Sequence, residues 1–149
     1  PFSPVPVTMQ TMVVLLSGAM LGPVAGAASQ ALYLSLGAAG LPVFTTGATL
    51  GLTGGYVVGF VVAAALIGFV TRRTSRDLPV VASMVAASAA IYLLGAIWLA
   101  MVTGMSTTQA LTVGVLPFLA GDAIKLAAAF GAWRTGRQVW ARATAGRGN

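Results

Sequence analysis

The chain alternates between long apolar runs and short polar or glycine-rich stretches. A helix that crosses a bilayer needs about 20 predominantly apolar residues, or somewhat fewer where its ends reach the interface. The pattern predicts five membrane-spanning helices by this measure. They are residues 7–21, 23–36, 54–72, 78–102 and 122–133. The pattern therefore indicates an all-α integral membrane protein with one transmembrane domain over residues 1–149.

Polar and helix-breaking residues mark the ends of these helices. A Gly-Pro step interrupts the first apolar run, and proline suits the first position of a helix, so we expect the second helix to begin at Pro23. Asp122 belongs to a favoured N-cap type, so we expect it to begin the last span. Residues 37–53 are rich in Gly, Thr and Pro and predict irregular backbone. Residues 106–119 predict a short surface helix that ends near Pro117.

The composition supports the membrane assignment. Hydrophobic residues make up 58% of the chain, charged residues only 7%, and the mean hydropathy is +0.93, whereas soluble domains carry about 25% charged residues. The net charge of +6 does not predict a nucleic-acid partner, because the arginines gather in two clusters that each follow an apolar run. Cysteine and histidine are absent, which excludes disulfides and the usual zinc, haem and copper sites.

The two arginine clusters predict the orientation, because loops rich in Lys and Arg stay on the cytoplasmic side of a membrane. The clusters are Arg72/Arg73/Arg76 and Arg134/Arg137/Arg142/Arg147. They place the C-terminus in the cytoplasm and residues 37–53 and 103–121 outside. Five spans then place residues 1–7 outside as well. We therefore expect one further helix before Pro1, absent from this sequence, and six helices in the whole protein.

Small residues recur at the four-residue spacing that lets helix backbones approach closely in lipid. The sets are Gly18/Gly22/Gly26, Gly55/Gly59, Ala86/Ala90 and Ala127/Gly131. We expect these residues to pack within one bundle rather than to form a dimer interface.

Asp122 and Lys125 are the most informative polar residues. Asp77 and Asp122 are the only acidic residues, and Lys125 is the only lysine. Ionisable groups in membrane segments are expensive to bury and are functional by default, and a spacing of three puts this pair on one helix face. Since a carboxylate accepts from N–H groups and an ammonium donates to a carbonyl or carboxylate, we predict contact with a small polar solute. The alternative is an N-cap beside a lysine that reaches the interface.

Two further stretches supply candidate contacts. Gly54, Gly55 and Tyr56 open a predicted helix, where free N–H groups and an aromatic face are available to a ligand. The alternative is a turn followed by an interfacial tyrosine. Gln30 and Tyr33 share a face of the second helix. Gln30 is a candidate contact, or alternatively it only bonds between helices.

Residues 40–44 predict a loop that covers a cavity, because non-helical backbone at membrane depth is tolerated only where it is buried in protein or lines a cavity. Phe44 is therefore a candidate contact. We expect Phe60, Tyr92 and Trp98 to lie in the bundle core or against lipid. The sequence contains no nucleophile–base pair and no phosphate-binding loop, so we expect no catalysis.

Five motifs, in order along nearly the whole chain, resemble those of the BioY family, the biotin-specific substrate-binding (S) subunits of energy-coupling factor (ECF) transporters. They are Pro4-Val-Pro-Val-Thr-Met-Gln-Thr11, Leu21-Gly-Pro23, Tyr33-Leu-Ser-Leu-Gly37 through Gly40-Leu-Pro-Val-Phe44, Thr53-Gly-Gly-Tyr56-Val-Val-Gly-Phe60, and Leu116-Pro-Phe-Leu-Ala-Gly-Asp122-Ala-Ile-Lys125. No single motif is decisive, but the five in sequence are.

The resemblance implies a six-helix S-component that takes biotin from outside the cell and has no cofactor of its own. It implies a prokaryotic cell (inner) membrane location, with a transmembrane coupling subunit and two ATPase subunits as partners. The family's Gly-Asp-x-x-Lys motif matches Asp122 and Lys125, and its Gly-Gly-Tyr motif matches residues 54–56. The resemblance implies that Asp122 accepts from the ureido N–H groups. Lys125 then serves either the ureido carbonyl or the valerate carboxylate.

The chain departs from the family pattern in two places. Leu52 stands where the family usually has proline, which should loosen that turn, and the first helix, which in S-components docks the coupling subunit, is absent from the sequence. Two other interpretations stay open. One is an S-component for another vitamin. The other is a structural membrane subunit in which the Asp122–Lys125 pair only locks helices together.

Overall fold

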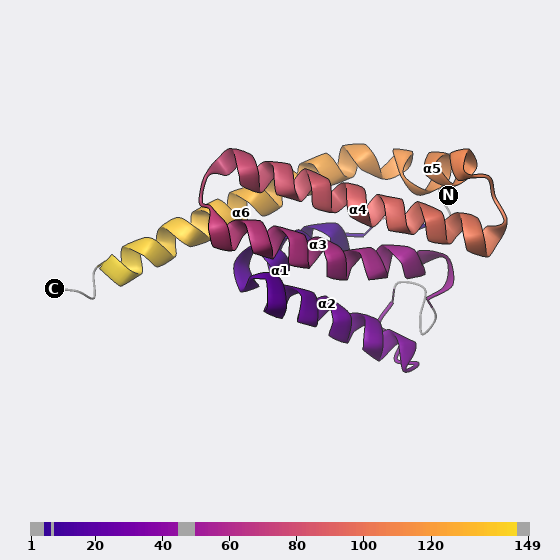
Figure 1. The fold of residues 1–149 in the computed structure, drawn as a ribbon, viewed down its shortest axis with the longest axis horizontal. Helices are drawn as coiled ribbons and strands as arrows, with labels where there is room; N and C mark the ends of the chain where they lie inside the picture. The colour runs from indigo at the N-terminus through magenta and orange to yellow at the C-terminus, as the bar shows by residue number, and fades with distance from the viewer. Residues whose placement is uncertain (1–4, 7, 45–49, 146–149) are drawn as a thin grey trace.

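The computed structural model describes Val5, Pro6, residues 8–44 and residues 50–145. This part of the chain is built from α-helices and two short 3₁₀ helices, η1 and η2 (Figure 1). In order they are α1 (Gln10–Leu21), α2 (Pro23–Ala38), η1 (Gly51–Thr53), α3 (Gly54–Arg73), α4 (Asp77–Thr103), α5 (Thr107–Gly114), η2 (Leu116–Phe118) and α6 (Leu119–Ala145). The prediction of an all-α membrane protein is confirmed.

Helix α3 is the centre of the bundle and packs against α1, α2 and α4 (Figure 1). Its side chains Ala63, Ala64 and Ile67 are fully buried, as are Met84 and Leu99 on α4. Helix α6 packs mainly against α1, and its C-terminal half extends beyond the other helices. The α3–α4 turn therefore lies at one end of the bundle and the η1–α3 junction at the other, about one helix length apart.

Three helical stretches in the described part of the chain are long and apolar enough to cross a membrane, instead of the five predicted. They are Gly51–Arg73, Asp77–Thr103 and Thr107–Ala143. Helix α1 has 12 residues, and at 1.5 Å per residue it covers about 18 Å, less than the roughly 30 Å of a hydrocarbon core. Helix α2 is also short, with 16 residues. The predicted helix before Pro1 lies outside this sequence and stays a prediction.

The boundaries differ from prediction at two helix starts. Helix α1 begins at Gln10, because Thr8 forms a turn in which its hydroxyl oxygen accepts from the Gln10 N–H at 3.3 Å. Helix α6 begins at Leu119, so Asp122 is in its first turn and is not the N-cap. The reason is Pro117, which lies in the first turn of η2. Its constrained φ favours a helical turn there, and η2 leads directly into α6.

The predicted end of the last span at residue 133 is also wrong, because α6 continues to Ala145. Most of the remaining predicted boundaries are confirmed. Helix α2 begins at Pro23, and α3 and α4 match their predicted ranges within one residue. The short helix α5 is confirmed, and Ser106 and Gln109 form a capping box at its start. Of the predicted irregular stretch, residues 45–49 lie outside the described residues, residues 37–38 belong to α2 and residues 51–53 form η1.

The small residues pack within the bundle at most of the predicted positions. A Cβ at Gly18 would overlap the backbone of Ala64 on α3, and one at Gly59 would overlap Ile91 on α4. A Cβ at Gly131 would meet no atom within 4 Å, so the prediction of bundle packing is wrong for the Ala127/Gly131 pair.

Gly55→Ala should lower the free energy of unfolding by about 2 kcal/mol, because a Cβ there would overlap the Leu94 carbonyl oxygen and the Trp98 Cβ and force α3 away from α4. The measurement is thermal unfolding of the purified protein in detergent. Gly131→Ala is the matched control. It adds the same methyl group to open space and should be neutral or slightly stabilising. A Gly55→Ala melting temperature equal to that of the native protein would contradict this packing argument.

Candidate functional site

Asp122 and Lys125 form a buried ion pair on the first two turns of α6. The Lys125 Nζ donates to Asp122 Oδ1 at 2.7 Å, and both residues are only 8% exposed. Their spacing of three residues brings them together on one face, as predicted. A buried pair of this kind needs further hydrogen bonds to offset the loss of hydration of both charges.

Two groups from other parts of the chain supply those hydrogen bonds. The Tyr92 hydroxyl, on α4, donates to Asp122 Oδ2 at 2.6 Å. Lys125 Nζ also donates to the backbone carbonyl of Thr8 at 2.5 Å. An ammonium has three protons and a carboxylate has about four acceptor positions. One lysine proton and two carboxylate positions therefore remain for a ligand.

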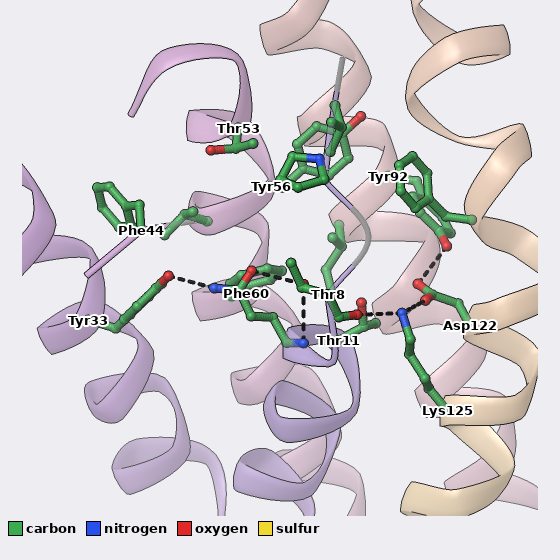
Figure 2. A pocket seen from close by; sticks show the side chains of 16 residues that line it. Thr8, Thr11, Tyr33, Phe44, Thr53, Tyr56, Phe60, Tyr92, Asp122 and Lys125 are labelled. Carbon is green, nitrogen blue, oxygen red and sulfur yellow. Dashed lines mark hydrogen bonds and ion pairs between the residues drawn. The ribbon is translucent and has the colours of Figure 1, made fainter. Parts of the chain in front are cut away.

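These side chains line a cavity that a second polar cluster closes on the opposite side (Figure 2). Gln10 Nε2 donates to the Tyr33 hydroxyl oxygen at 2.5 Å, and the Tyr33 hydroxyl donates to the Val43 carbonyl at 3.2 Å. The Thr8 hydroxyl donates to Gln10 Oε1 at 3.1 Å. A chain of hydrogen bonds therefore runs along the cavity from the loop at Val43 through Thr8 to the ion pair.

Aromatic and aliphatic side chains complete the lining. The residues around the cavity are Val5, Pro6, Thr8, Gln10, Thr11, Tyr33, Phe44, Thr53, Tyr56, Val57, Phe60, Ile91, Tyr92, Phe118, Asp122 and Lys125. They come from the segment before α1, from Phe44 in the loop after α2, and from every described helix except α5. The cavity measures about 50 Å³, whereas pockets that enclose small molecules measure about 300–1,000 Å³. Side chains must therefore move to admit a solute.

The structure brings five of the predicted contacts together: Asp122, Lys125, Tyr56, Tyr33 and Phe44. The Tyr56 hydroxyl donates to the Gly114 carbonyl at 2.8 Å, so the ring is the part of Tyr56 that is available to a solute. The rings of Tyr33 and Phe44 meet edge to face, with centroids 5.3 Å apart.

The other three predicted contacts do not line this cavity. Gln30 is buried and its Nε2 donates to Ser17 Oγ at 3.0 Å, which is the bond between helices that the sequence left as the alternative. It lines a separate groove between α1 and α2. Gly54 and Gly55 are buried where α3 meets Trp98 of α4. In this arrangement their lack of a side chain serves helix packing.

Several cavity residues were missed or misplaced by sequence reasoning. Phe60 is buried in the hydrophobic core and Tyr92 packs against that core, as expected, but both also line the cavity, which the sequence did not predict. Gln10, Thr11 and Thr53 were not proposed as contacts. The polar residues Thr8, Gln10 and Thr11 at the start of an apolar helix were the available signal for the first two. Trp98 lies in the bundle as expected, and its ring N–H donates to the Gly51 carbonyl at 2.9 Å.

Within the described ranges, no group of three or more Asp, Glu, His or Cys side chains could hold a metal ion. The site is thus a small cavity with a mixed polar and aromatic lining, in which one carboxylate and one ammonium lie side by side. Such a site suits a neutral polar group that has adjacent donors and acceptors, within a ligand that is otherwise apolar.

Comparison with known proteins identifies the family. The family model described as "BioY family" matches residues 1–142. The chain belongs to the BioY family. The resemblance drawn from the five motifs is therefore confirmed.

Two curated BioY relatives are similar over most of the chain. The probable biotin transporter BioY of Pyrococcus horikoshii is 39% identical over 131 residues, which cover 85% of this chain and 76% of the relative. The biotin transporter BioY of Thermotoga maritima is 40% identical over 134 residues, which cover 87% of this chain and 79% of the relative.

A solved structure supports the same fold. The crystal structure of the S-component for biotin from an ECF-type ABC transporter matches with a TM-score of 0.82 and 28% identity. The match covers 93% of this chain and 78% of that protein. The arrangement of helices around the cavity is therefore that of a BioY S-component.

Proposed function

We propose that this BioY protein binds biotin in the cavity beside Asp122 and Lys125 and is the substrate-specific subunit of an ATP-driven ECF transporter. The observation that carries the proposal is the buried ion pair, in which the acceptor Oδ1 and the donor Nζ lie 2.7 Å apart on the cavity wall. The named relatives are biotin transporters, and the solved S-component is specific for biotin.

The ion pair matches the chemistry of the ureido ring of biotin. A ureido group presents an N–H donor next to a carbonyl acceptor, so the carboxylate of Asp122 would accept from the N–H while Lys125 donates its remaining proton to the carbonyl. Placing Lys125 on the ureido carbonyl fits its position, because its ammonium is already held beside Asp122. The rings of Phe44, Tyr56 and Phe60 would contact the apolar part of the ligand.

The valerate carboxylate of biotin would then lie among uncharged groups. Residues 1–71 contain no charged side chain, and among the residues that the structure describes Lys125 is the only basic one that lines the cavity. Gln10, Tyr33 and Thr53 line the side formed by the earlier helices. The Gln10 amide has a second N–H beside the one given to Tyr33, while the Tyr33 and Thr53 hydroxyls donate to the Val43 and Leu50 carbonyls and would have to turn to serve a carboxylate. The pocket is therefore expected to recognise the ureido end by charge and the valerate end by neutral hydrogen bonds.

The orientation proposed from the arginines fits the position of the cavity. Tyr56 lines the cavity and Arg72 lies near the other end of the same helix, 16 residues further on, about 24 Å at 1.5 Å per residue. With the arginine end and the C-terminus in the cytoplasm, the cavity opens toward the outside of a prokaryotic inner membrane. A transmembrane coupling subunit and two ATPase subunits would supply the energy for release into the cell.

Calorimetric titration of biotin into the purified full-length protein in detergent tests the proposal, with radiolabelled biotin as a second assay. Saturable binding at about one biotin per chain would support it. Absence of binding in both assays, from a monodisperse and folded sample, would refute it. Binding of a different vitamin in the same assays would point to an S-component for that vitamin, and no binding of any would favour a structural subunit.

A further inference from the structure

Tyr92 places a single hydroxyl where α4 faces the ion pair. Its neighbours along α4 are apolar from Ala89 to Gly95. The hydroxyl points to Asp122 and donates to Oδ2 at 2.6 Å (Figure 2). We propose that Tyr92 is a positioning residue that holds the Asp122 carboxylate toward the solute cavity, an inference that rests on the proposed function.

The carboxylate has a second cavity that it can face. Asp122 and Tyr92 both line the solute cavity, and both also line an apolar groove of about 260 Å³ between α4 and α6. The remaining groove residues are Val85, Ser88, Ala89, Leu119, Ala123 and Leu126. The Tyr92–Asp122 hydrogen bond therefore lies at the boundary between a polar cavity and an apolar one. Packing alone does not force the carboxylate to the polar side.

The other partner of the carboxylate cannot perform this task. Lys125 holds Oδ1 at 2.7 Å, but it lies on the same helix, one turn away. Its Nζ is anchored in turn on the Thr8 carbonyl, so this bond fixes the position of Oδ1 and leaves the position of Oδ2 to the bond from Tyr92. The bond from Tyr92 comes from α4 and is the one that ties Oδ2 across the gap between the two helices.

The bond also keeps acceptor positions available. A carboxylate has about four acceptor positions. Tyr92 occupies one on Oδ2 and Lys125 one on Oδ1, so one remains on each oxygen. Because Asp122 lines the solute cavity and these two bonds hold the plane of its carboxylate, the free positions would be available there to ureido N–H groups. Pre-organised acceptors of this kind avoid the ordering cost that a freely rotating carboxylate would add on binding.

Tyr92→Phe removes only the hydroxyl and tests the proposal with two measurements. The first is biotin affinity, which should fall about 10-fold, as expected for a hydrogen bond to a charged group. The second is the carboxyl ¹³C NMR signal of Asp122 in protein labelled at aspartate. Because the chain has only two acidic residues, Asp77 and Asp122, the spectrum has two side-chain carboxyl signals, and Asp77→Asn assigns them.

Trp98→Phe is the matched control. It also removes one hydrogen-bond donor from an aromatic ring of α4, but that donor serves the Gly51 carbonyl and Trp98 does not line the cavity. Tyr92→Phe should shift the Asp122 signal in the absence of biotin, whereas Trp98→Phe should leave the signal in place and the affinity within about twofold. If the Tyr92 hydroxyl served only the fold, Tyr92→Phe would lower the melting temperature and leave the Asp122 signal unshifted.

An unshifted Asp122 signal, or a biotin affinity in Tyr92→Phe within about twofold of the native value, would overturn the proposal. A Tyr92→Phe protein that is not monodisperse would also overturn it, by showing that the hydroxyl is needed for folding. If the native protein binds no biotin, the proposed function fails, and this inference fails with it. The NMR shift would then report only that Tyr92 orients Asp122. Biotin binding by the native protein tests the proposed function, and the comparison of Tyr92→Phe with the native protein tests the role of Tyr92, so the two failures are distinguishable.

Discussion

Asp122→Asn should lower biotin affinity by at least about 100-fold while the protein remains folded. The carboxylate is buried on the cavity wall and accepts from Lys125 and Tyr92. An asparagine has one acceptor oxygen in place of two and no charge. Each hydrogen bond to a charged group contributes roughly 1.5–3 kcal/mol, and about 2.8 kcal/mol corresponds to 100-fold in affinity. Calorimetric titration and radioligand binding would measure the loss.

Asp77→Asn is the matched control, because it makes the same change at the only other acidic residue. Asp77 is half exposed and lies 3.4 Å from Arg134 at the end of the bundle away from the cavity. Its replacement should leave biotin affinity unchanged. An Asp122→Asn protein that retains full affinity would remove Asp122 from the site. If the native protein binds no biotin and Asp122→Asn loses its fold, the two results together would favour the structural-subunit interpretation.

Lys125→Met should have the largest effect on stability of the single changes considered. It leaves the buried Asp122 carboxylate without its counter-charge and removes the bond to the Thr8 carbonyl. Breaking a buried ion pair by removing one partner lowers the free energy of unfolding by about 3–5 kcal/mol. Biotin binding should also be lost, since the proposed donor to the ureido carbonyl is gone. Thermal unfolding and biotin titration would measure both effects.

The double variant Asp122→Asn/Lys125→Met separates the two roles of the pair. Removal of both charges leaves no unpaired buried charge, so much of the stability lost in Lys125→Met should return. Biotin binding should not return, because neither the acceptor nor the donor is present. A double variant that regains stability and also binds biotin would show that the ion pair only locks helices. A Lys125→Met protein as stable as the native one would contradict the burial argument.

The order of helices was predictable because it depends on local properties of the chain. Apolar runs bounded by Pro23 and by arginines predicted α2, α3 and α4 within two residues at each end. The start of α6 was predicted three residues late, because the favourable N-cap chemistry of Asp122 was weighed without the helical turn that Pro117 begins. Local rules compete at such a boundary, and the sequence does not show which one prevails.

The cavity was only partly predictable. Tyr92 gave no signal, since α4 is apolar on nearly all sides and no face of it is marked as facing a site. Gln30 and Gln10 are both polar residues in apolar helices, yet Gln10 lines the cavity and Gln30 bonds to Ser17. The difference depends on how α1 and α2 are rotated about their axes, and hydropathy does not specify that rotation in helices that are apolar all round.

The sequence by itself determined the membrane class, the order of the helices, the BioY motifs and the pairing of Asp122 with Lys125. Each of these follows from composition or from a spacing within one helix, where 3.6 residues per turn decides which side chains meet. Only the tertiary structure decided that Tyr92 of α4 and the carbonyl of Thr8 complete the pair, and that Gln10 and Tyr33 face it across the cavity. These contacts join residues 23 to 117 positions apart. They depend on the close approach of particular helices and not on any periodicity along the chain.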